Sequence, residues 1–270
     1  MTRTRRARTG RDNPQARNQF LPSLSPAMIS AGRLAVRERL VRESPRLDKR
    51  DFAAISGSDL RILFEAYDDV FFQKQLTVLL ESTRHSMFFE VSTRMTTAGA
   101  NISRRSSGRR AGVFRIAISA PVLFSSFREP GEAFEVNGLT CTNRLQALQV
   151  LMEHELVHLY EMLQSGASGH GPSFREIARG LFGHTDYRHA LMTPAKRTST
   201  ALGLRAGELV SFNFRGRRLV GTLNGVAKRA TVLVSHEDGT EYSDGQKYLK
   251  FYVPLIALSK VRNGPCSAGG

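Results

Sequence analysis

Residues 151–174, LMEHELVHLYEMLQSGASGHGPSF, combine a strong helical pattern with most of the chemically informative side chains of this chain. His154 and His158 are four residues apart, so on a helix their imidazoles lie on one face, one turn apart. Glu155 follows His154 directly and can reach a metal-bound water rather than the metal. The spacing predicts a metal centre in which Glu155 is the general base.

The helix that carries this motif is expected to run from Thr142 to Gln164, with Thr142 or Asn143 as its N-cap. Its apolar side chains recur at helical spacing and form one stripe, made of Leu145, Leu148, Met152, Leu156, Leu159 and Leu163. We therefore expect one face to build the core while the other presents the histidines.

A third ligand has to come from elsewhere. Glu161 shares the histidine face, but it lies seven residues beyond His154, a rise of roughly 10 Å, whereas ligand atoms sit about 2 Å from an ion. Glu161 is expected to support the site or to face solvent. His170 follows a flexible break, SGASG, that can fold the chain back, and His184 and His189 compete with it.

The ion expected here is Zn²⁺ in a catalytic role. A zinc site with three protein ligands leaves a position for water and lowers the pKa of that water toward 7. Structural zinc sites favour cysteine and four protein donors, whereas this chain contains only Cys141 and Cys266. The alternative without a metal is an amphipathic helix whose polar face happens to include histidines.

Composition indicates a globular protein with an unusual charge. The chain has 270 residues, of which 41% are hydrophobic and 23% charged, and its 39 Lys and Arg against 24 Asp and Glu give a net charge of +15. Such an excess favours partners that are polyanions, above all DNA or RNA. Two distant cysteines and the lack of an apolar signal region or membrane-length run predict a cytoplasmic protein, with nucleoid association as an option.

Along the chain, residues 1–50 are expected to be a basic, largely disordered arm with a short helix within 28–50. A packed helix is predicted to begin at Ser58 as N-cap, and strands are predicted in FFEVSTRM and VFRIAISAPVLF, joined by a basic hairpin loop. After a predicted linker at 194–203, the pattern changes to short strands with Gly-containing turns over 204–263, which favours a small SH3-like β barrel.

Two basic groups are candidates for nucleic-acid contact. The first lies in or beside the expected hairpin loop and includes Arg104, Arg105, Arg109, Arg110 and Arg115; the second belongs to the expected barrel and includes Arg215, Arg217, Arg218, Lys228 and Arg229. Phe212 and Phe214 alternate with polar residues, so we expect them in the barrel core rather than stacked on bases.

The segments YDDVFF, STRMTTAGA, FRIAISAPVLF, HELVH and GHGPSF occur in this order between about residues 58 and 192. Over that range the chain resembles the SprT-like zinc metallopeptidase family, in its bacterial type with a C-terminal small β domain. The resemblance implies an α+β fold, with a zincin-like domain at 51–193 followed by an SH3-like barrel. It implies that His154, His158 and His170 bind zinc and that Glu155 is the general base.

The chain departs from the family pattern in two ways. No Cys-rich zinc ribbon follows the domain, and FGHTDYRHALMTP keeps His184 as a rival for His170 and offers Asp186 as a carboxylate that orients a histidine. The resemblance implies a peptidase that acts on proteins bound near nucleic acid, as in DNA–protein crosslink repair. The alternative is a nucleic-acid-binding accessory protein whose zinc site is structural or catalytically silent.

Overall fold

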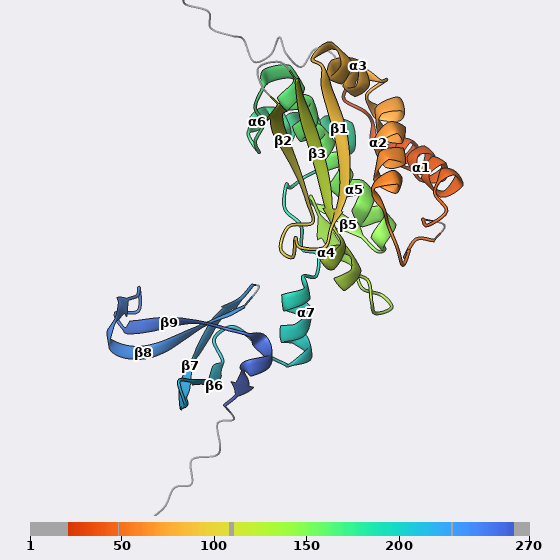
Figure 1. The fold of residues 1–270 in the computed structure, drawn as a ribbon. Helices are drawn as coiled ribbons and strands as arrows, with labels where there is room; N and C mark the ends of the chain where they lie inside the picture. The colour runs from red at the N-terminus through yellow and green to blue at the C-terminus, as the bar shows by residue number, and fades with distance from the viewer. Residues whose placement is uncertain (1–20, 48, 108–110, 228, 262–270) are drawn as a thin grey trace, which may run out of the picture. The chain divides into compact units, whose positions relative to one another are not determined.

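The computed structural model describes residues 21–47, 49–107, 111–227 and 229–261, and the fold is α+β (Figure 1). Seven α-helices lie in this part of the chain: α1 (Pro26–Glu43), α2 (Gly57–Phe71), α3 (Gln75–Ser82), α4 (Ala120–Ser125), α5 (Arg144–Ser165), α6 (Pro172–Phe182) and α7 (Pro194–Ala201). The strands are β1 (His85–Ser92), β2 (Ala100–Ser107), β3 (Ala111–Ser119), β4 (Phe134–Val136), β5 (Leu139–Cys141), β6 (Leu209–Phe214), β7 (Arg217–Val226), β8 (Ala230–Glu241), β9 (Lys247–Val253) and β10 (Ser259–Lys260).

The chain divides into two compact units. The first contains the described residues of Met1–Val91, Ala100–Ile118 and Ala133–Ala190, and the second those of Ser92–Gly99, Ser119–Glu132 and Leu191–Gly270. Each unit therefore gathers segments from separate parts of the sequence. No helix in the described ranges is both long enough and apolar enough to cross a membrane.

Helix α5 is the central element of the first unit. Asn143 is its N-cap and accepts the backbone N–H of Gln146 at 3.0 Å, while Gly166 ends the helix in the left-handed conformation with φ of 80°. The predicted stripe is confirmed, because its first five members are buried: Leu145, Leu148, Met152, Leu156 and Leu159. The expected helix at 142–164 is thus correct to within two residues at each end.

A second apolar face of α5 is buried as well, formed by Val150, Leu151, Val157 and Tyr160. The helix packs against α2, α3 and α6 and also against β2, β4 and β5, so it has neighbours on several sides. In Figure 1 the strands β1, β3 and β2 pass in front of it. Surrounding elements hold the helix in place, and only a narrow polar strip remains for a site.

The N-cap of α2 differs from the prediction. Ser56, not Ser58, caps the helix, because Ser56 and Asp59 form a capping box in which Asp59 Oδ2 accepts the Ser56 backbone N–H at 2.7 Å. The Ser58 hydroxyl instead lies 2.7 Å from the Ser56 hydroxyl. Either serine can cap a helix, and the reciprocal bond with Asp59 decides between them.

The short helix predicted within 28–50 is present as α1, but it begins at Pro26, is longer than expected and packs against α2, so this part of the arm is ordered. Val36 and Leu40 are fully buried, and Ile29 is nearly so. The sparse apolar residues of α1 gave only a weak helical pattern, and the packing against α2 supplies what the pattern lacks. Residues 1–20 lie outside the described residues.

The first sheet has the strand order β1-β3-β2, and β2 pairs with β3 antiparallel with Ile102 opposite Ile116. The segment expected to be a hairpin loop is therefore mostly strand β2. Its polar sequence, ANISRRSS, gives little strand signal. Because β2 lies at the outer edge of the sheet, few of its side chains need to be apolar.

The second unit holds a five-stranded antiparallel sheet in the order β10-β6-β7-β8-β9. The predicted closed barrel is not found, because no hydrogen-bonded pairing joins the outer strands β9 and β10 in the described residues, and β10 is only two residues long. One face of the sheet still covers a small core that includes Val210, Phe212, Leu223, Val232 and Val253.

The expected linker at 194–203 is wrong, since most of it forms α7. Thr193 caps this helix by accepting the backbone N–H of Lys196 at 3.1 Å, and Pro194 takes the first helical position. Within the second unit α7 packs against α4 and β7. The sequence suggested that Thr193 and Pro194 end an element, whereas in the structure they begin a helix.

Candidate metal centre

Helix α5 brings two histidines together. His154 and His158 are one turn apart, and their Nε2 atoms are 3.1 Å from each other. Both side chains are partly buried, because neighbouring elements enclose this part of α5. The spacing in the sequence predicted this pairing, and the structure confirms the common face.

His170 completes the group. Gly166 ends α5 in a left-handed turn, so the following segment reverses toward the helix. His170 Nε2 then lies 3.2 Å from His158 Nε2 and 3.1 Å from His154 Nε2. These are the three side chains of the described residues whose ligand atoms gather closely enough to hold one metal ion.

The donor set fits a divalent cation of the zinc type. Three nitrogens separated by 3.1 to 3.2 Å can each bond to one ion at about 2.0 to 2.1 Å. Neutral imidazole suits zinc, copper, iron and nickel, so the ligands alone do not select among these metals. Three protein donors also leave room for a water or a substrate atom on the ion.

Ser168 and Glu161 set the orientation of His158. The Ser168 hydroxyl donates to Glu161 Oε2, so its oxygen accepts the Nδ1–H of His158 across 2.7 Å. This bond places the proton of a neutral His158 on Nδ1 and leaves Nε2 free as a ligand. Glu161 therefore supports the site rather than binding the ion, one of the two roles expected for it.

Aromatic rings enclose the histidines. The buried Phe174 of α6 contacts all three imidazoles, with ring centroids 4.4 Å from His158, 4.9 Å from His154 and 5.1 Å from His170. Tyr187 stacks on His170 at 4.6 Å with an interplanar angle of 19°. The sequence analysis did not assign these two residues to the site, although Phe174 lies in the GHGPSF segment.

Enclosure keeps the imidazoles neutral. Burial, with the charges of neighbouring histidines, lowers the pKa of His154 to about 2 and that of His158 to about 4. Burial and the positive charge of Arg175 lower the pKa of His170 as well. Neutral imidazoles at physiological pH are the form that binds a metal.

Glu155, the residue after His154 on α5, carries a buried carboxyl group. It is 4% exposed, and burial raises its pKa to about 8, although the backbone N–H of Ile102 acts in the opposite direction. A carboxyl with a pKa close to the working pH can both take up and release a proton. Its position next to His154 in the sequence and its contact with β2 place it at the edge of the sheet.

Comparison with known proteins adds no family assignment. No protein-family model matches this chain, and neither the curated proteins nor the solved structures contain a significant match. The geometry of the site is therefore the basis on which a function can be inferred.

His184 is not a member of the three-histidine group. It is buried, and its Nε2 lies 2.8 Å from Glu153 Oε2. Because a carboxylate only accepts, Nε2 carries the proton in this bond. His189 is not a member of the group either, and its backbone forms an isolated β-bridge with Val136. Of the competing histidines, His170 alone joins His154 and His158.

Glu153 is the centre of a buried polar network behind the site. Arg33 binds both of its carboxylate oxygens, at 2.7 and 2.6 Å, and the Tyr67 hydroxyl donates to it at 2.7 Å. Burial alone would raise the pKa of Glu153, but the hydrogen bonds and charge of Arg33, helped by His184, lower it. Sequence reasoning missed this network, because Arg33 lies in the expected arm, far from Glu153 in the chain.

Asp186 does not orient a histidine through any bond the structure gives. Its Oδ1 accepts the backbone N–H of Tyr187 at 2.6 Å, and its own N–H donates to the Asn137 carbonyl. The carboxylate therefore shapes the loop that carries Tyr187.

The basic residues of the first unit do not form the single loop cluster that was expected. Arg104 and Arg105 are exposed but adjacent in β2, so their side chains leave opposite faces of the strand. Arg115 pairs with Glu90 at 2.6 Å. Arg109 and Arg110 lie outside the described residues.

In the second unit, Arg217 and Arg218 are exposed on β7, and Arg218 donates to Ser211 Oγ at 3.0 Å. Arg229 lines a cavity of about 430 Å³, and Lys228 lies outside the described residues. Phe212 is in the core, as predicted. Phe214 is not, because it is 44% exposed with the Arg215 guanidinium over its ring.

Proposed function

We propose that this protein is a zinc-dependent peptidase of SprT-like type. The observation that carries the proposal is the convergence of three Nε2 atoms, from His154, His158 and His170, and the next residue after His154 is Glu155, whose carboxyl is buried. A structural metal site does not require a carboxyl that is not a ligand, and burying a carboxyl away from water costs free energy. Its presence favours catalysis over a purely structural role.

In this proposal each residue has a defined task. His154, His158 and His170 would hold the zinc, which would supply Lewis acidity and a water of lowered pKa. Glu155 is the residue that would accept a proton from the attacking water and return it to the leaving amine. His158 is held in position by Ser168 and Glu161, and Phe174 keeps bulk water away from the imidazoles.

Strand β2 is suited to hold the substrate chain. It is the outer strand of its sheet, and the Ile102 N–H binds Glu155 instead of a partner strand. An extended peptide can bind such an edge by adding a strand, which would place its carbonyls near Glu155. The net charge of +15 supports substrates that are proteins bound to DNA or RNA.

The substitution Glu155→Gln tests the proposal. It removes the base and keeps the shape, so cleavage of a histone mixture, measured with and without single-stranded DNA, should fall at least ~100-fold. Zinc content should stay unchanged. The matched control is Glu81→Gln, on the exposed surface of α3, which should cleave normally. Undiminished cleavage by the Glu155→Gln protein would refute the mechanism.

The second candidate is a nucleic-acid-binding protein with a silent metal site, which the net charge of +15 favours. It predicts an affinity for DNA or RNA that falls steeply with salt, because binding releases counterions, and no proteolysis under any condition. Measuring both properties on the zinc-loaded protein separates the two candidates.

A further inference from the structure

A recess of about 220 Å³ lies beside the histidine group, between α6 and the loop that follows it. Phe174 and Tyr187 line this recess, and the same two rings contact the metal centre, Phe174 on all three imidazoles and Tyr187 on His170. A group bound in the recess is therefore separated from the histidines by a single aromatic ring.

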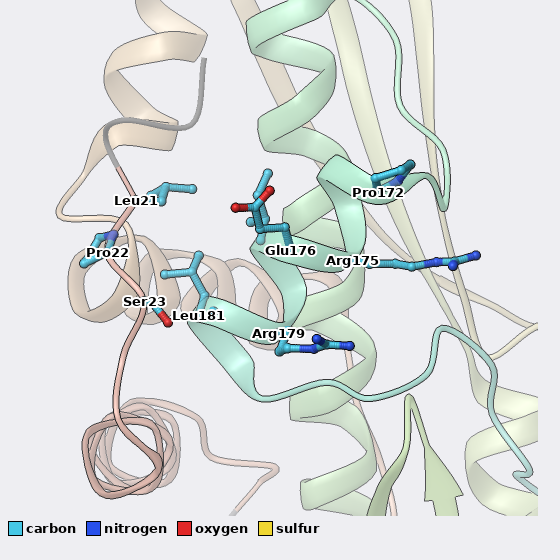
Figure 2. A pocket seen from close by; sticks show the side chains of 10 residues that line it. Leu21, Pro22, Ser23, Pro172, Arg175, Glu176, Arg179 and Leu181 are labelled. Carbon is cyan, nitrogen blue, oxygen red and sulfur yellow. The ribbon is translucent and has the colours of Figure 1, made fainter. Parts of the chain in front are cut away.

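Two positive charges line the recess. Arg175 and Arg179 are one turn apart on α6, and Figure 2 shows both side chains leaving the helix on the side away from Leu21, Pro22 and Ser23. Neither guanidinium forms an ion pair with another described residue. The one acidic side chain in the lining, Asp186, accepts the Tyr187 backbone N–H, so positive charge is in excess.

The recess also contains a buried group that lacks a partner. His184 lines it and is 3% exposed, and its Nδ1 has no hydrogen-bond partner among the described residues. Its Nε2–H is used by Glu153, whose charge Arg33 already balances. Because Nδ1 itself is buried, His184 belongs to the wall of the recess and is fixed there by its bond to Glu153.

We infer that this recess binds an acidic side chain of the polypeptide substrate. The carboxylate pairs with Arg175 and Arg179, whose side chains line the recess. Guanidinium groups suit carboxylates, which they bind through paired N–H donors. The recess has room for a side chain and lies next to the histidines at which the proposed reaction takes place, so a polypeptide is the anion expected in it. This inference rests on the proposed peptidase function, because it names the substrate of that site.

Binding can be measured without cleavage by using the zinc-loaded Glu155→Gln protein. The probes are fluorescein-labelled ten-residue peptides, randomised except for one central position fixed as Glu, Gln or Lys. We expect the Glu pool to bind about tenfold more tightly than the Gln pool, as a charge-assisted pair worth ~1.4 kcal/mol would give. Adding Arg179→Gln or Arg175→Gln should reduce this preference to less than twofold.

The control is Arg84→Gln, which removes one charge from an exposed arginine that does not line the recess and should keep the preference. The reversal Arg179→Glu should shift binding toward the Lys pool. Equal binding of the Glu and Gln pools overturns the inference, as does an equal effect of Arg84→Gln and Arg179→Gln. It is also overturned if Arg179→Gln weakens binding of a single-stranded DNA 20-mer but not of the Glu pool.

Failure of the peptidase proposal would look different. A wild-type protein that cleaves no substrate, yet keeps an arginine-dependent preference for the Glu pool, refutes the proposed reaction and supports an acidic-peptide site in this recess.

Discussion

At the residue scale, three histidine nitrogens and one carboxyl determine what this protein can do. His154 and His158 were paired by their spacing, whereas the choice between His170 and His184 needed the fold. His170 reaches the pair because α5 ends at Gly166, and His184 is held by Glu153. Phe174, Ser168 and Tyr187 then set the environment of the imidazoles.

The substitutions His170→Ala and His184→Ala should separate these roles. His170→Ala removes one of three donors and should abolish stoichiometric zinc after dialysis against a competing chelator, with the fold intact by circular dichroism. His184→Ala should retain zinc but lower the free energy of unfolding, because Glu153 loses a buried partner. A folded His184→Ala protein without zinc, beside a His170→Ala protein with zinc, would contradict this ligand set.

The raised pKa of Glu155 predicts a pH effect on the metal-free protein. Its folded pKa, about 8, is above its ordinary value of 4.5, so between these values the folded state holds more protons than the unfolded state. The stability contributed by the protonated carboxyl is complete below about pH 4.5 and is lost as pH rises through 8. The metal-free Glu155→Gln protein has no carboxyl at this position and should not lose this stability as pH rises.

We therefore expect Glu155→Gln to become more stable than wild type, by several kcal/mol at most, as pH rises from 5 to 9. Urea unfolding with a chelator present measures the difference. The lowered pKa values of His154 and His158 act oppositely below pH 6.5, but they are common to both proteins and cancel. A difference that does not change with pH would show that Glu155 is not buried as described.

At the element scale, α1 is longer and more firmly packed than the sequence pattern indicated. Three of its side chains are buried, and Arg33 extends from it to Glu153 on α5. The lack of a continuous apolar stripe concealed its extent, because a helix docked through a few side chains and one ion pair leaves most positions polar. Strand β2 was missed for a related reason, since an edge strand tolerates a polar sequence.

Loss of Arg33 should show how strongly α1 is bound. Arg33→Met leaves Glu153 without its cation at 0% exposure, and breaking a buried pair in this way costs about 3 to 5 kcal/mol. The control on the same helix is Arg39→Met, whose partially exposed pairs with Glu43 and Asp69 contribute much less because solvent screens them. Equal losses of unfolding free energy for both variants would contradict the account of the network.

At the scale of the whole molecule, the chain forms two compact units with separate cores. The histidine site belongs to the first unit, and the five-stranded open sheet to the second. A ligand stabilises only the unit to which it binds. Zinc is therefore expected to act on one unfolding transition and not on the other.

Calorimetry with and without zinc tests this expectation. Zinc at 100 times its Kd should stabilise the first unit by about 2.7 kcal/mol, while the transition of the second unit stays in place. Leu223→Ala, a fully buried position of the second core, should lower only that second transition. If zinc shifts both transitions together in the Leu223→Ala protein, the two units do not unfold independently.

The amino-acid sequence alone determined the features that depend on local spacing. These were the helix at 142–164, its buried stripe, the shared face of His154 and His158, and the position of Glu155. Helical periodicity and capping depend on residues a few positions apart, so a short stretch of sequence is enough to predict them.

Tertiary structure decided the features that join distant residues. It placed His170 rather than His184 with the pair, bound Arg33 to Glu153, made β2 from a polar segment, and left the C-terminal sheet open where a barrel was expected. Each of these depends on which elements meet in space. That choice is made by burial and by pairing across long sequence separations, which no local pattern records.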